Sequence, residues 1–599
     1  MCGIYGMVAL TGALRWPERA DQLAAAVRDR GPDAHGRHTS PVALLGVHRL
    51  RVVDTTPNAD QPFVTDRHVL AINGEVYNSA ELYRRYPSFQ RTSQSDGESM
   101  LPLLADGDPE ALSSVAGMFA LAHWTEATRT LILARDPAGE KPLFHVAMGN
   151  EVWFASSQDA LRHHPQLTRA LDLDAARDFL SLGVVREPRS LSAGIRMVPA
   201  GSAMVFRPHD TLSIHYAASD PVRRPVSATE VGDALDAAIE RQLRADVPIG
   251  VFLSGGMDSS LVAHTAARHR PGLPAFAVGF PEASYDERPA ARRAARHFGL
   301  PLTEVLADPT ALLRARDVAI GLAEPIADPA LLPTILLAER AKQDVTVVLS
   351  GEGADELFGG YPTYLGHRLA NALPSRLAPF TLRLAPLFGS HRSDRRMPLS
   401  WLARRFLESA ALPLPERHIA WFSGALPSSV LTSSTNVQRA TCNEDPIRWA
   451  MDFDRTVYLR ERLLVKLDRA TMRVGLEARA PFLDPAVVAL ARAAGPGAHV
   501  GFRGKRLLRR VARQRLPSFI VRQTKRGLSV PIGALINGAL ASETNRLLAP
   551  AQLGHLGLVR PGAVAGLLAE HRAGRADHGR ALWTLLTFEA WRERHGMDG

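Results

Sequence analysis

Residues 247–260 read VPIGVFLSGGMDSS, an apolar stretch that runs into a Ser-Gly-Gly turn and then into a helix-like segment. A strand that leads through such a turn into a helix directs backbone N–H groups and the helix amino terminus toward a bound anion. The glycines allow a phosphate to approach the backbone closely. The GxxxxGK(S/T) pattern of the usual P-loop is absent. Alone, the stretch predicts either a phosphate site of another type or a plain glycine-rich turn.

The sequence around this stretch alternates predicted strands with predicted helices. Residues 228–244 are helix-like, and the preceding Ser227 has the capping-box spacing to Glu230. PAFAVGF (274–280) and VTVVLSG (345–351) are predicted strands. The alternation predicts an α/β doubly wound domain, in which ligands bind at the carboxyl ends of the strands.

An acidic loop, SGEGADELFGGY (350–361), follows the second of these strands. Its carboxylates stand where an open α/β sheet binds its ligands. A solvated acidic turn is the alternative, but the flanking glycines and the apolar Leu357-Phe358 favour a packed loop. The helical, Leu- and Arg-rich residues 366–449 carry no chemical signature, and we interpret them as a packing insertion.

The first 205 or so residues have a different pattern, in which short apolar runs alternate with turns, as in VALLGVHRL (42–50) and HVLAINGEVYN (68–78). Such runs predict the strands of sheets. A Pro- and Arg-rich stretch, 209–225, breaks the pattern and is the predicted linker. A chain of 599 residues is too long for one hydrophobic core. We therefore expect two domains, 1–208 and 226–599.

The chain begins with Met1-Cys2-Gly3. Removal of Met1 would leave Cys2 with a free α-amino group, whose reference pKa is about 7.7–8.0 and which can activate the thiol beside it. An incidental cysteine is the alternative. A pocket for glutamine needs a cation, an anion and neutral donors for an oxyanion. Four segments supply these residue types: RGPDAHG (30–36), HRLRVVD (48–54), NGEVYN (73–78) and SDGE (95–98).

With these segments and RDPAGEKPLFH (135–145), about the first 200 residues resemble the class II glutamine amidotransferases. The resemblance implies an α+β amino-terminal-nucleophile hydrolase fold of four layers, αββα, and makes Cys2 the nucleophile. It also implies two oxyanion donors and a set of glutamine-binding residues. The donors are Asn73 and Gly74, and the other pocket residues are Arg49 for the carboxylate, Asp96 for the α-ammonium group, and Glu75.

The SGGxDS pattern resembles the pyrophosphate loop of enzymes that cleave ATP between the α and β phosphates. Together with five further motifs, it makes nearly the whole of 225–535 similar to the asparagine synthetases. The motifs are YDE (285–287), EPIADPALLPT (324–334), LLVKLDRATMRVGLEARAPFLD (463–484), GKRLLR (504–509) and RQTKRGLSVP (522–531).

This resemblance implies a role for each matching residue. Asp258 and Asp355 would hold Mg²⁺, Lys505 would stabilise the transition state at the α-phosphorus, and Glu352 would be the base when ammonia attacks. The remaining residues would bind ATP: Leu253, Ser254, Gly255, Gly256, Asp258, Ser259, Ser260, Val278, Ser350 and Gly351.

The combined resemblance predicts a glutamine-dependent asparagine synthetase, which adenylates the side chain of aspartate and then amidates it, with an internal passage for ammonia. An amidotransferase of the same fold that acts on a natural-product or peptide carboxylate is the alternative. A catalytically inert relative is disfavoured because the residues that carry the chemistry are present. Two departures from the family are Ser157, where glutamate is usual, and Ala330, where serine is common.

Composition limits the other classes of function. The formal charge of +10 comes from basic residues, mostly Arg, that are spread along the chain, so we expect no nucleic-acid partner. No apolar run reaches the ~18 residues of a membrane span. Two cysteines and no signal-peptide pattern predict a cytoplasmic protein. A homodimer is compatible with the sequence. Lysine occurs at only five positions, 141, 342, 466, 505 and 525.

Overall fold

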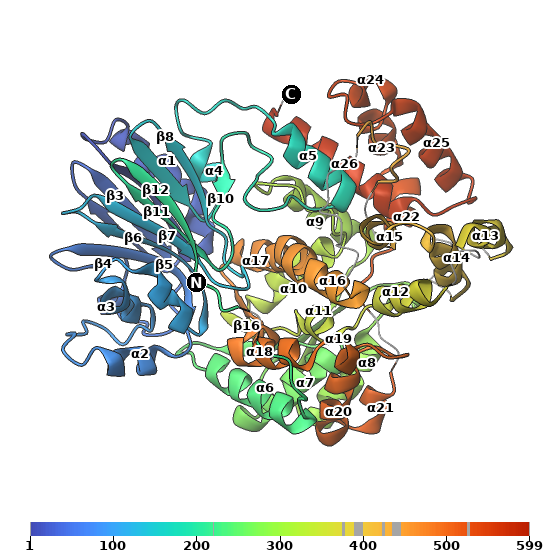
Figure 1. Cartoon of the computed structure of the whole chain (residues 1–599), viewed down its shortest axis with the longest axis horizontal. Coiled ribbons are helices and arrows are strands. Elements are labelled where there is room, and N and C mark those ends of the chain that lie inside the picture. The colour runs from blue at the N-terminus through green and yellow to red at the C-terminus, as the bar shows by residue number, and fades with distance from the viewer. Residues whose placement is uncertain are drawn as a thin grey trace.

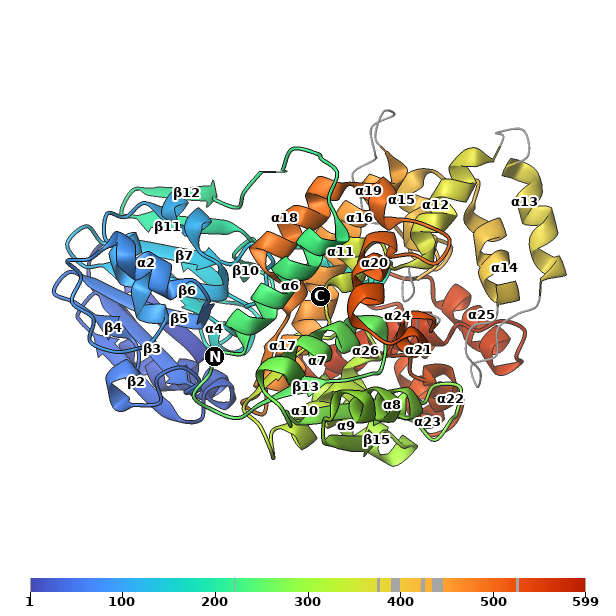
Figure 2. The same cartoon turned by 90° about the horizontal axis from the view of Figure 1, so that it is seen from below.

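The computed structural model of the chain describes residues 2–219, 221–373, 378–388, 399–421, 426–433, 445–523 and 527–597. A β-rich part, drawn in blue and teal, lies beside a larger part in which helices surround a further sheet (Figure 1 and Figure 2). In both views the N-terminus lies at the junction of the two parts. Strand β1 (Cys2–Ala9) therefore starts where the parts meet.

Two antiparallel sheets of six strands make up the β-rich part. The first has the order β10-β8-β9-β1-β3-β2, with β10 (Arg196–Met197), β8 (Phe144–Met148), β9 (Glu151–Ala155), β3 (Ala43–Arg49) and β2 (Ala34–Thr39) around β1. The second has the order β12-β11-β7-β6-β5-β4, with β12 (Asp210–His215), β11 (Ser202–Arg207), β7 (Thr130–Arg135), β6 (Gly117–Thr125), β5 (His68–Val76) and β4 (Phe63–Val64).

The two sheets pack face to face and are covered by helices on both outer faces. In β1, Ile4 and Val8 belong to the core between the sheets, whereas Tyr5 and Met7 belong to the core beneath α1 (Ala20–Val27) and α4 (Gln158–Leu161). This alternation follows from the two-residue period of a strand. The helices α2 (Ser79–Arg85) and α3 (Met100–Leu104) cover the second sheet. The four-layer αββα prediction is confirmed.

The third sheet is parallel and has five strands in the order β15-β14-β13-β16-β17. The first strand of this sheet in sequence, β13, lies in its middle, and later strands are added on one side and then on the other. Helices therefore cover both faces, as the doubly wound prediction requires. The strands are β13 (Ile249–Phe252), β14 (Ala275–Gly279), β15 (Leu302–Leu306), β16 (Val347–Leu349) and β17 (Glu477–Arg479). One face packs on α6 (Ala228–Gln242), α7 (Met257–His269), α8 (Arg288–Phe298) and α20 (Arg506–Arg515), and the other on α9 (Pro309–Ile320), α10 (Leu331–Ala341) and α17 (Val465–Met472).

Further helices extend this domain. The capping box predicted for α6 is present, with both Ser227 and Glu230 in their expected contacts. The described part of 366–449 is largely helical: α12 (Pro362–Ala372), α13 (Ala378–Leu384), α14 (Leu399–Ser409), α15 (Leu414–Trp421) and the start of α16 (Pro446–Phe453). The other additions are α18 (Pro485–Ala494), α19 (Pro496–His499), α21 (Ser518–Val521), α22 (Ile532–Asn537), α23 (Ala541–Leu547), α24 (Pro550–Leu553), α25 (Pro561–Arg572) and α26 (Gly579–His595). In the described ranges, no helix combines the length and apolar character needed to cross a membrane.

The predicted linker 209–225 is wrong in its first half. Strand β12 lies within it and pairs with β11 across a tight turn, for example Val205 with Leu212. All residues of β12 except Ile214 are exposed, because it is an edge strand, so its sequence lacks the apolar run that marks the other strands. The β-rich part therefore extends to His215, beyond the predicted end at 208.

Helix α5 (Leu173–Leu182) belongs to the amino-terminal segment in sequence but packs on the second domain in space. Its Phe179 and Leu180 lie in the same core as residues of α10 and α26, and the rings of Phe179 and Phe588 are 5.9 Å apart. Figure 1 shows α5 beside α26. The two domains therefore share part of one hydrophobic core.

A buried ion pair also joins the domains. Arg30 and Asp468 form two hydrogen bonds, Nη1 to Oδ2 at 2.8 Å and Nη2 to Oδ1 at 2.9 Å, and both side chains are largely buried. Burial by itself would raise the pKa of Asp468, but the Arg30 guanidinium holds it below its usual value. The same guanidinium donates through Nε to the carbonyl oxygen of Cys2 at 3.3 Å.

Replacing Asp468 by asparagine should lower the melting temperature markedly, because the Arg30 guanidinium is then buried without its counter-ion, a change that typically costs about 3–5 kcal/mol. The matched control is Glu593→Gln, which removes a partner of Arg546 where the side chains are 52% and 54% exposed, and where about 0–1 kcal/mol is expected. Thermal unfolding followed by circular dichroism makes the comparison. Equal melting temperatures for the two variants would contradict the structural role of the pair.

Candidate active sites

Cys2 stands at the start of β1 and is 4% exposed. Its N–H donates to Asn73 Oδ1 at 3.0 Å, and Gln61 Nε2 lies 3.7 Å from its Sγ. Burial raises the pKa of the thiol, although positive charge nearby, including Arg49, acts in the opposite direction. A buried neutral thiol needs a base before it becomes a nucleophile, which is the role we expect of the α-amine.

Asn73 and Gly74 lie in β5, opposite Cys2. The Asn73 side chain is fully buried; its Oδ1 accepts from Cys2, and its Nδ2 has no hydrogen-bond partner in the part of the chain that the structure describes. A buried donor without a partner is costly unless a ligand satisfies it. A Cβ at Gly74 would come within 2.0 Å of the Met118 carbonyl oxygen, so only glycine fits there. The predicted role of the pair as oxyanion donors requires an available donor of this kind at Asn73 Nδ2.

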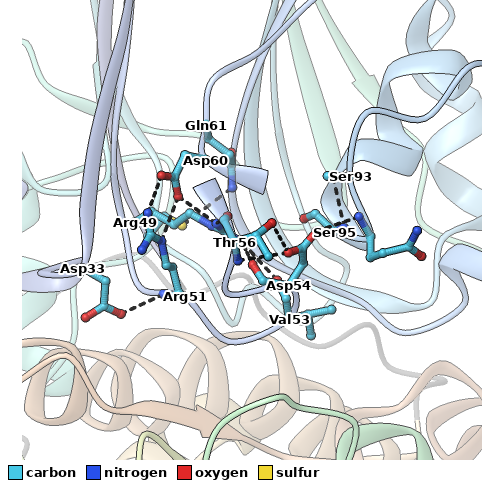
Figure 3. Close-up of polar contacts among 12 residues, drawn as sticks. Asp33, Arg49, Arg51, Val53, Asp54, Thr56, Asp60, Gln61, Ser93 and Ser95 are labelled. Atoms are coloured by element: carbon cyan, nitrogen blue, oxygen red, sulfur yellow. Dashed lines mark hydrogen bonds and ion pairs between the residues drawn. The ribbon is translucent and has the colours of Figure 1, made fainter. Parts of the chain in front are cut away.

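Arg49 is held in a fixed position before any ligand binds (Figure 3). Its guanidinium donates to the carbonyl oxygens of Val53 (3.0 Å) and Asp54 (2.7 Å) and to Asp60 Oδ1 (2.8 Å). Asp60 is shared with Arg51, which contacts both of its oxygens. Sequence reasoning missed Asp60. A substrate carboxylate at Arg49 would therefore join, or displace, an existing anion.

The carboxyl groups of Glu75 and Asp96 are both buried near this pocket. Asp96 Oδ2 accepts from the Val76 N–H, and burial raises its pKa. Glu75 Oε2 lies 3.2 Å from Nη2 of Arg479, a residue of β17 in the other domain. Burial, and then the negative charge of Asp96, raise the pKa of Glu75 well above its ordinary value. Glu75 is thus a contact between the domains as well as a pocket residue.

The predicted pyrophosphate loop connects β13 to α7. Gly255 has φ +74°, and a Cβ there would lie 2.4 Å from the backbone of Ala290, so the turn requires glycine. Ser254 Oγ lies 3.0 Å from Ser259 Oγ. The N-cap residue of α7 is Gly256, so no side chain at this position caps the first N–H groups of the helix. Free N–H groups at the amino terminus of a long helix bind anions. The Ser260 hydroxyl is buried with no partner in the described ranges.

Lys505 joins the two predicted magnesium ligands. Its Nζ lies 2.6 Å from Asp258 Oδ2 and 2.7 Å from Asp355 Oδ1. Burial would lower the pKa of Lys505, but the two carboxylates raise it. A Cβ at Gly360 would meet Asp355 Oδ1 at 1.8 Å, which explains the glycine in this loop. In the described ranges no three His, Cys, Asp or Glu side chains gather as a metal site, so two carboxylates fit a magnesium ion only if phosphate oxygens and water complete its shell.

The remaining predicted residues line the carboxyl ends of the strands. Ser350 follows β16, donates its N–H to the Arg479 carbonyl (2.8 Å) and accepts through Oγ from the Glu352 N–H (3.3 Å). A Cβ at Gly351 would lie 3.0 Å from the Ser259 nitrogen, so the acidic loop and the pyrophosphate loop touch. Leu253 directly follows β13, and Val278 lies near the carboxyl end of β14; their side chains are buried in the cores on opposite faces of the sheet.

Two residues to which the sequence analysis assigned no role, Lys466 and Asp328, lie beside the acidic loop. Glu352 Oε1 lies 3.7 Å from Lys466 Nζ, and the same ammonium lies 3.3 Å from Asp328 Oδ2. Both residues stand in motifs quoted above, and the scarcity of lysine was a usable signal for Lys466. Ala330, the departure from the family, is 4% exposed and donates its N–H to Asp328 Oδ1 at 3.0 Å.

Comparison with known proteins gives matches over almost the whole chain. A family model described as asparagine synthase matches residues 230–593, and one described as a glutamine amidotransferase domain matches 1–217. Asparagine synthetase [glutamine-hydrolyzing] 1 of Bacillus subtilis is 30% identical over 99% of this chain and 96% of that protein. A Mycobacterium bovis protein provisionally named as a glutamine-hydrolyzing asparagine synthetase is 33% identical over 99% and 97%. Asparagine synthetase B of Escherichia coli is 31% identical over 62% and 66%.

Proposed function

The chain belongs to the glutamine-hydrolysing asparagine synthetase family, and from the geometry of its two sites we propose that it converts the side-chain carboxylate of aspartate into an amide, with glutamine as nitrogen donor and ATP as activator. The observation that carries the proposal is the meeting of Lys505, Asp258 and Asp355 beside the pyrophosphate loop. That arrangement suits the α-phosphate chemistry of a synthetase. Arg30, which donates to the Cys2 carbonyl oxygen, also forms an ion pair with Asp468 of the second domain.

Glutamine hydrolysis would take place at Cys2. The thiolate attacks the carboxamide carbon, and the oxyanion that forms accepts hydrogen bonds from Asn73 Nδ2 and the N–H of Gly74. Arg49 would bind the α-carboxylate of glutamine, and Asp96 its ammonium group. The orphan Nδ2 of Asn73 supports this assignment, because the developing oxyanion gives it a partner. The α-amine passes the proton that it took from the thiol to the departing nitrogen, ammonia leaves, and water hydrolyses the thioester to release glutamate.

Activation of the acceptor would take place at the pyrophosphate loop. The acceptor carboxylate attacks the α-phosphorus, and pyrophosphate leaves toward Ser254, Gly256 and the amino terminus of α7. Lys505 stabilises the charge at the α-phosphate as a compact cation. A magnesium ion held by Asp258 and Asp355 would neutralise phosphate oxygens.

Amide formation completes the reaction. Ammonia attacks the acyl carbon of the adenylate, the new C–N bond forms, one proton passes to the Glu352 carboxylate, and the C–O bond to AMP breaks. Ammonia from the Cys2 site would reach Glu352 through the protein interior, because release to water would protonate it. We place this reaction in the cytoplasm, where cysteine thiols remain reduced.

Cys2→Ala should abolish the use of glutamine, because the nucleophile is lost, while ammonia still supports amide formation at the intact second site. Glutamate release and AMP release are measured in parallel, with glutamine or ammonium chloride as nitrogen donor. Glutamate release at the wild-type rate by this variant would exclude Cys2 as the nucleophile.

Lys505→Ala should reduce acceptor-dependent exchange of pyrophosphate into ATP by about 10²–10³-fold, since one transition-state contact is lost. Lys505→Arg should also be impaired, because a planar guanidinium does not fit between carboxylates 2.6 and 2.7 Å from the ammonium. Glutaminase activity serves as the internal control for folding. Exchange at the wild-type rate in either variant would refute the role.

The acceptor is tested with a panel of acids, in which AMP release is measured with glutamine present. We expect L-aspartate to be active, with weakened affinity that Ala330→Ser restores in part, since one neutral hydrogen bond is worth about 0.5–1.5 kcal/mol. Glutamate, malonate and larger carboxylates complete the panel. If another acid gives AMP and aspartate does not, the alternative, an amidotransferase for a specialised carboxylate, replaces the asparagine assignment.

A further inference from the structure

Lys466 is a buried cation that has no role in the proposed reaction steps. It lies in the first turn of α17 and is 5% exposed. Its ammonium group stands between carboxylates from two other elements, Asp328 before α10 and Glu352 after β16. A buried lysine at such a junction is ionised only because anions surround it, and Asp328, followed by Glu352, raises the pKa of Lys466 against the effect of burial.

Both carboxylate oxygens of Asp328 are engaged. One carboxylate oxygen accepts from the Ala330 N–H at 3.0 Å, and the other contacts Lys466 at 3.3 Å. Burial would raise the pKa of Asp328, but Lys466 and then Arg462 hold it at about 2, so the group is an anion throughout the neutral range. Asp328 is therefore a fixed anchor for the ammonium.

The Glu352 end is open to the site. The Glu352 side chain is 27% exposed, and at 3.7 Å its contact with Lys466 is an ion pair longer than a hydrogen bond. Another titratable group of this loop is Glu356, which is buried and accepts from the Tyr361 hydroxyl; burial, and then the negative charge of Asp355, raise the pKa of Glu356 to about 8. In the described ranges, Lys466 is the cation that forms an ion pair with Glu352.

Lys505 does not share these partners. Within the described residues, Lys505 forms ion pairs with Asp258 and Asp355, at the pyrophosphate loop, whereas Lys466 forms ion pairs with Asp328 and Glu352. The two buried lysines therefore contact different parts of the proposed site. Lys505 contacts the carboxylates at the pyrophosphate loop, and Lys466 contacts the predicted base, Glu352.

We propose that Lys466 is a positioning residue that directs the Glu352 carboxylate toward the acyl carbon and keeps it ready to take the proton of the attacking ammonia. The assignment rests on the proposed function, in which Glu352 is that base. Asp328 holds the Lys466 ammonium in place, and the ammonium in turn orients the Glu352 carboxylate. The first half-reaction, in which the acceptor attacks ATP, does not require this row of charges.

The test separates the two half-reactions in the full-length enzyme with ammonium chloride as nitrogen donor. Lys466→Met removes the charge and keeps the length of the side chain. Amide formation should fall by roughly 10²-fold, the lower end of what a general base contributes, while acceptor-dependent ATP–pyrophosphate exchange changes little. The matched control is Lys342→Met, which removes another partly buried ammonium, one that donates to the Gly475 carbonyl at 2.8 Å. It should leave both rates unchanged.

A double-mutant cycle with Glu352→Gln tests whether Lys466 acts through Glu352. Added to Glu352→Gln, the Lys466→Met change should cost almost nothing further in amide formation, because the group that it positions is already lost. Losses that multiply in the double variant, or equal loss of both half-reactions in Lys466→Met, would overturn the assignment while leaving the proposed function intact. A wild-type enzyme that shows no exchange with any acid of the panel would overturn the proposed function, and this assignment with it.

Discussion

A guanidinium from the first domain and a carboxylate from the second meet in the buried two-point ion pair of Arg30 and Asp468. Such a pair tolerates little displacement, because either charge alone would be stranded in a poorly solvated interior. Arg30 also donates to the carbonyl of Cys2, so the position of the nucleophile depends on the same contact. Asp468 and Lys466 are two residues apart on α17 and so point about 200° apart around its axis, at 100° per residue. One short helix therefore carries a contact to each active site.

A second contact crosses the same junction at Arg479, which is completely buried. Its guanidinium lies 3.2 Å from Glu75 of the proposed glutamine pocket, and its backbone carbonyl accepts from the N–H of Ser350 of the proposed ATP site. Burial would lower the pKa of Arg479, yet Glu477 and then Glu75 raise it. The interface is thus specified by matched buried charges as well as by the shared apolar core around α5, and charges that must be paired fix its register.

Local patterns predicted the elements that local physics determines. The strand, glycine turn and helix at 247–260 and the capping box at Ser227 were recognisable because adjacent residues satisfy one another. What sequence could not provide were contacts between distant segments, such as Arg30 with Asp468, 438 positions apart. The edge strand β12 was not predicted because its exposed residues form no apolar run. The contact of Asp60 with Arg49 was not predicted because a single aspartate in a loop is usually solvated. Among the predicted site residues, Asn73 accepts a hydrogen bond from Cys2, and Lys505 forms an ion pair with Asp258.

Arginine and lysine make different kinds of buried contact in this protein, and the difference follows from the shapes of their charged groups. Arginine forms the permanent contacts, in which a planar group with several donors meets fixed acceptors, as at Arg30, Arg49 and Arg479. Lys466 and Lys505 instead stand each between two carboxylates, where a compact ammonium can shift from one anion to another by rotating its flexible stem. In a chain that uses arginine almost everywhere else, the cation at both of these junctions is a lysine, whose compact ammonium is contacted by two carboxylates at once.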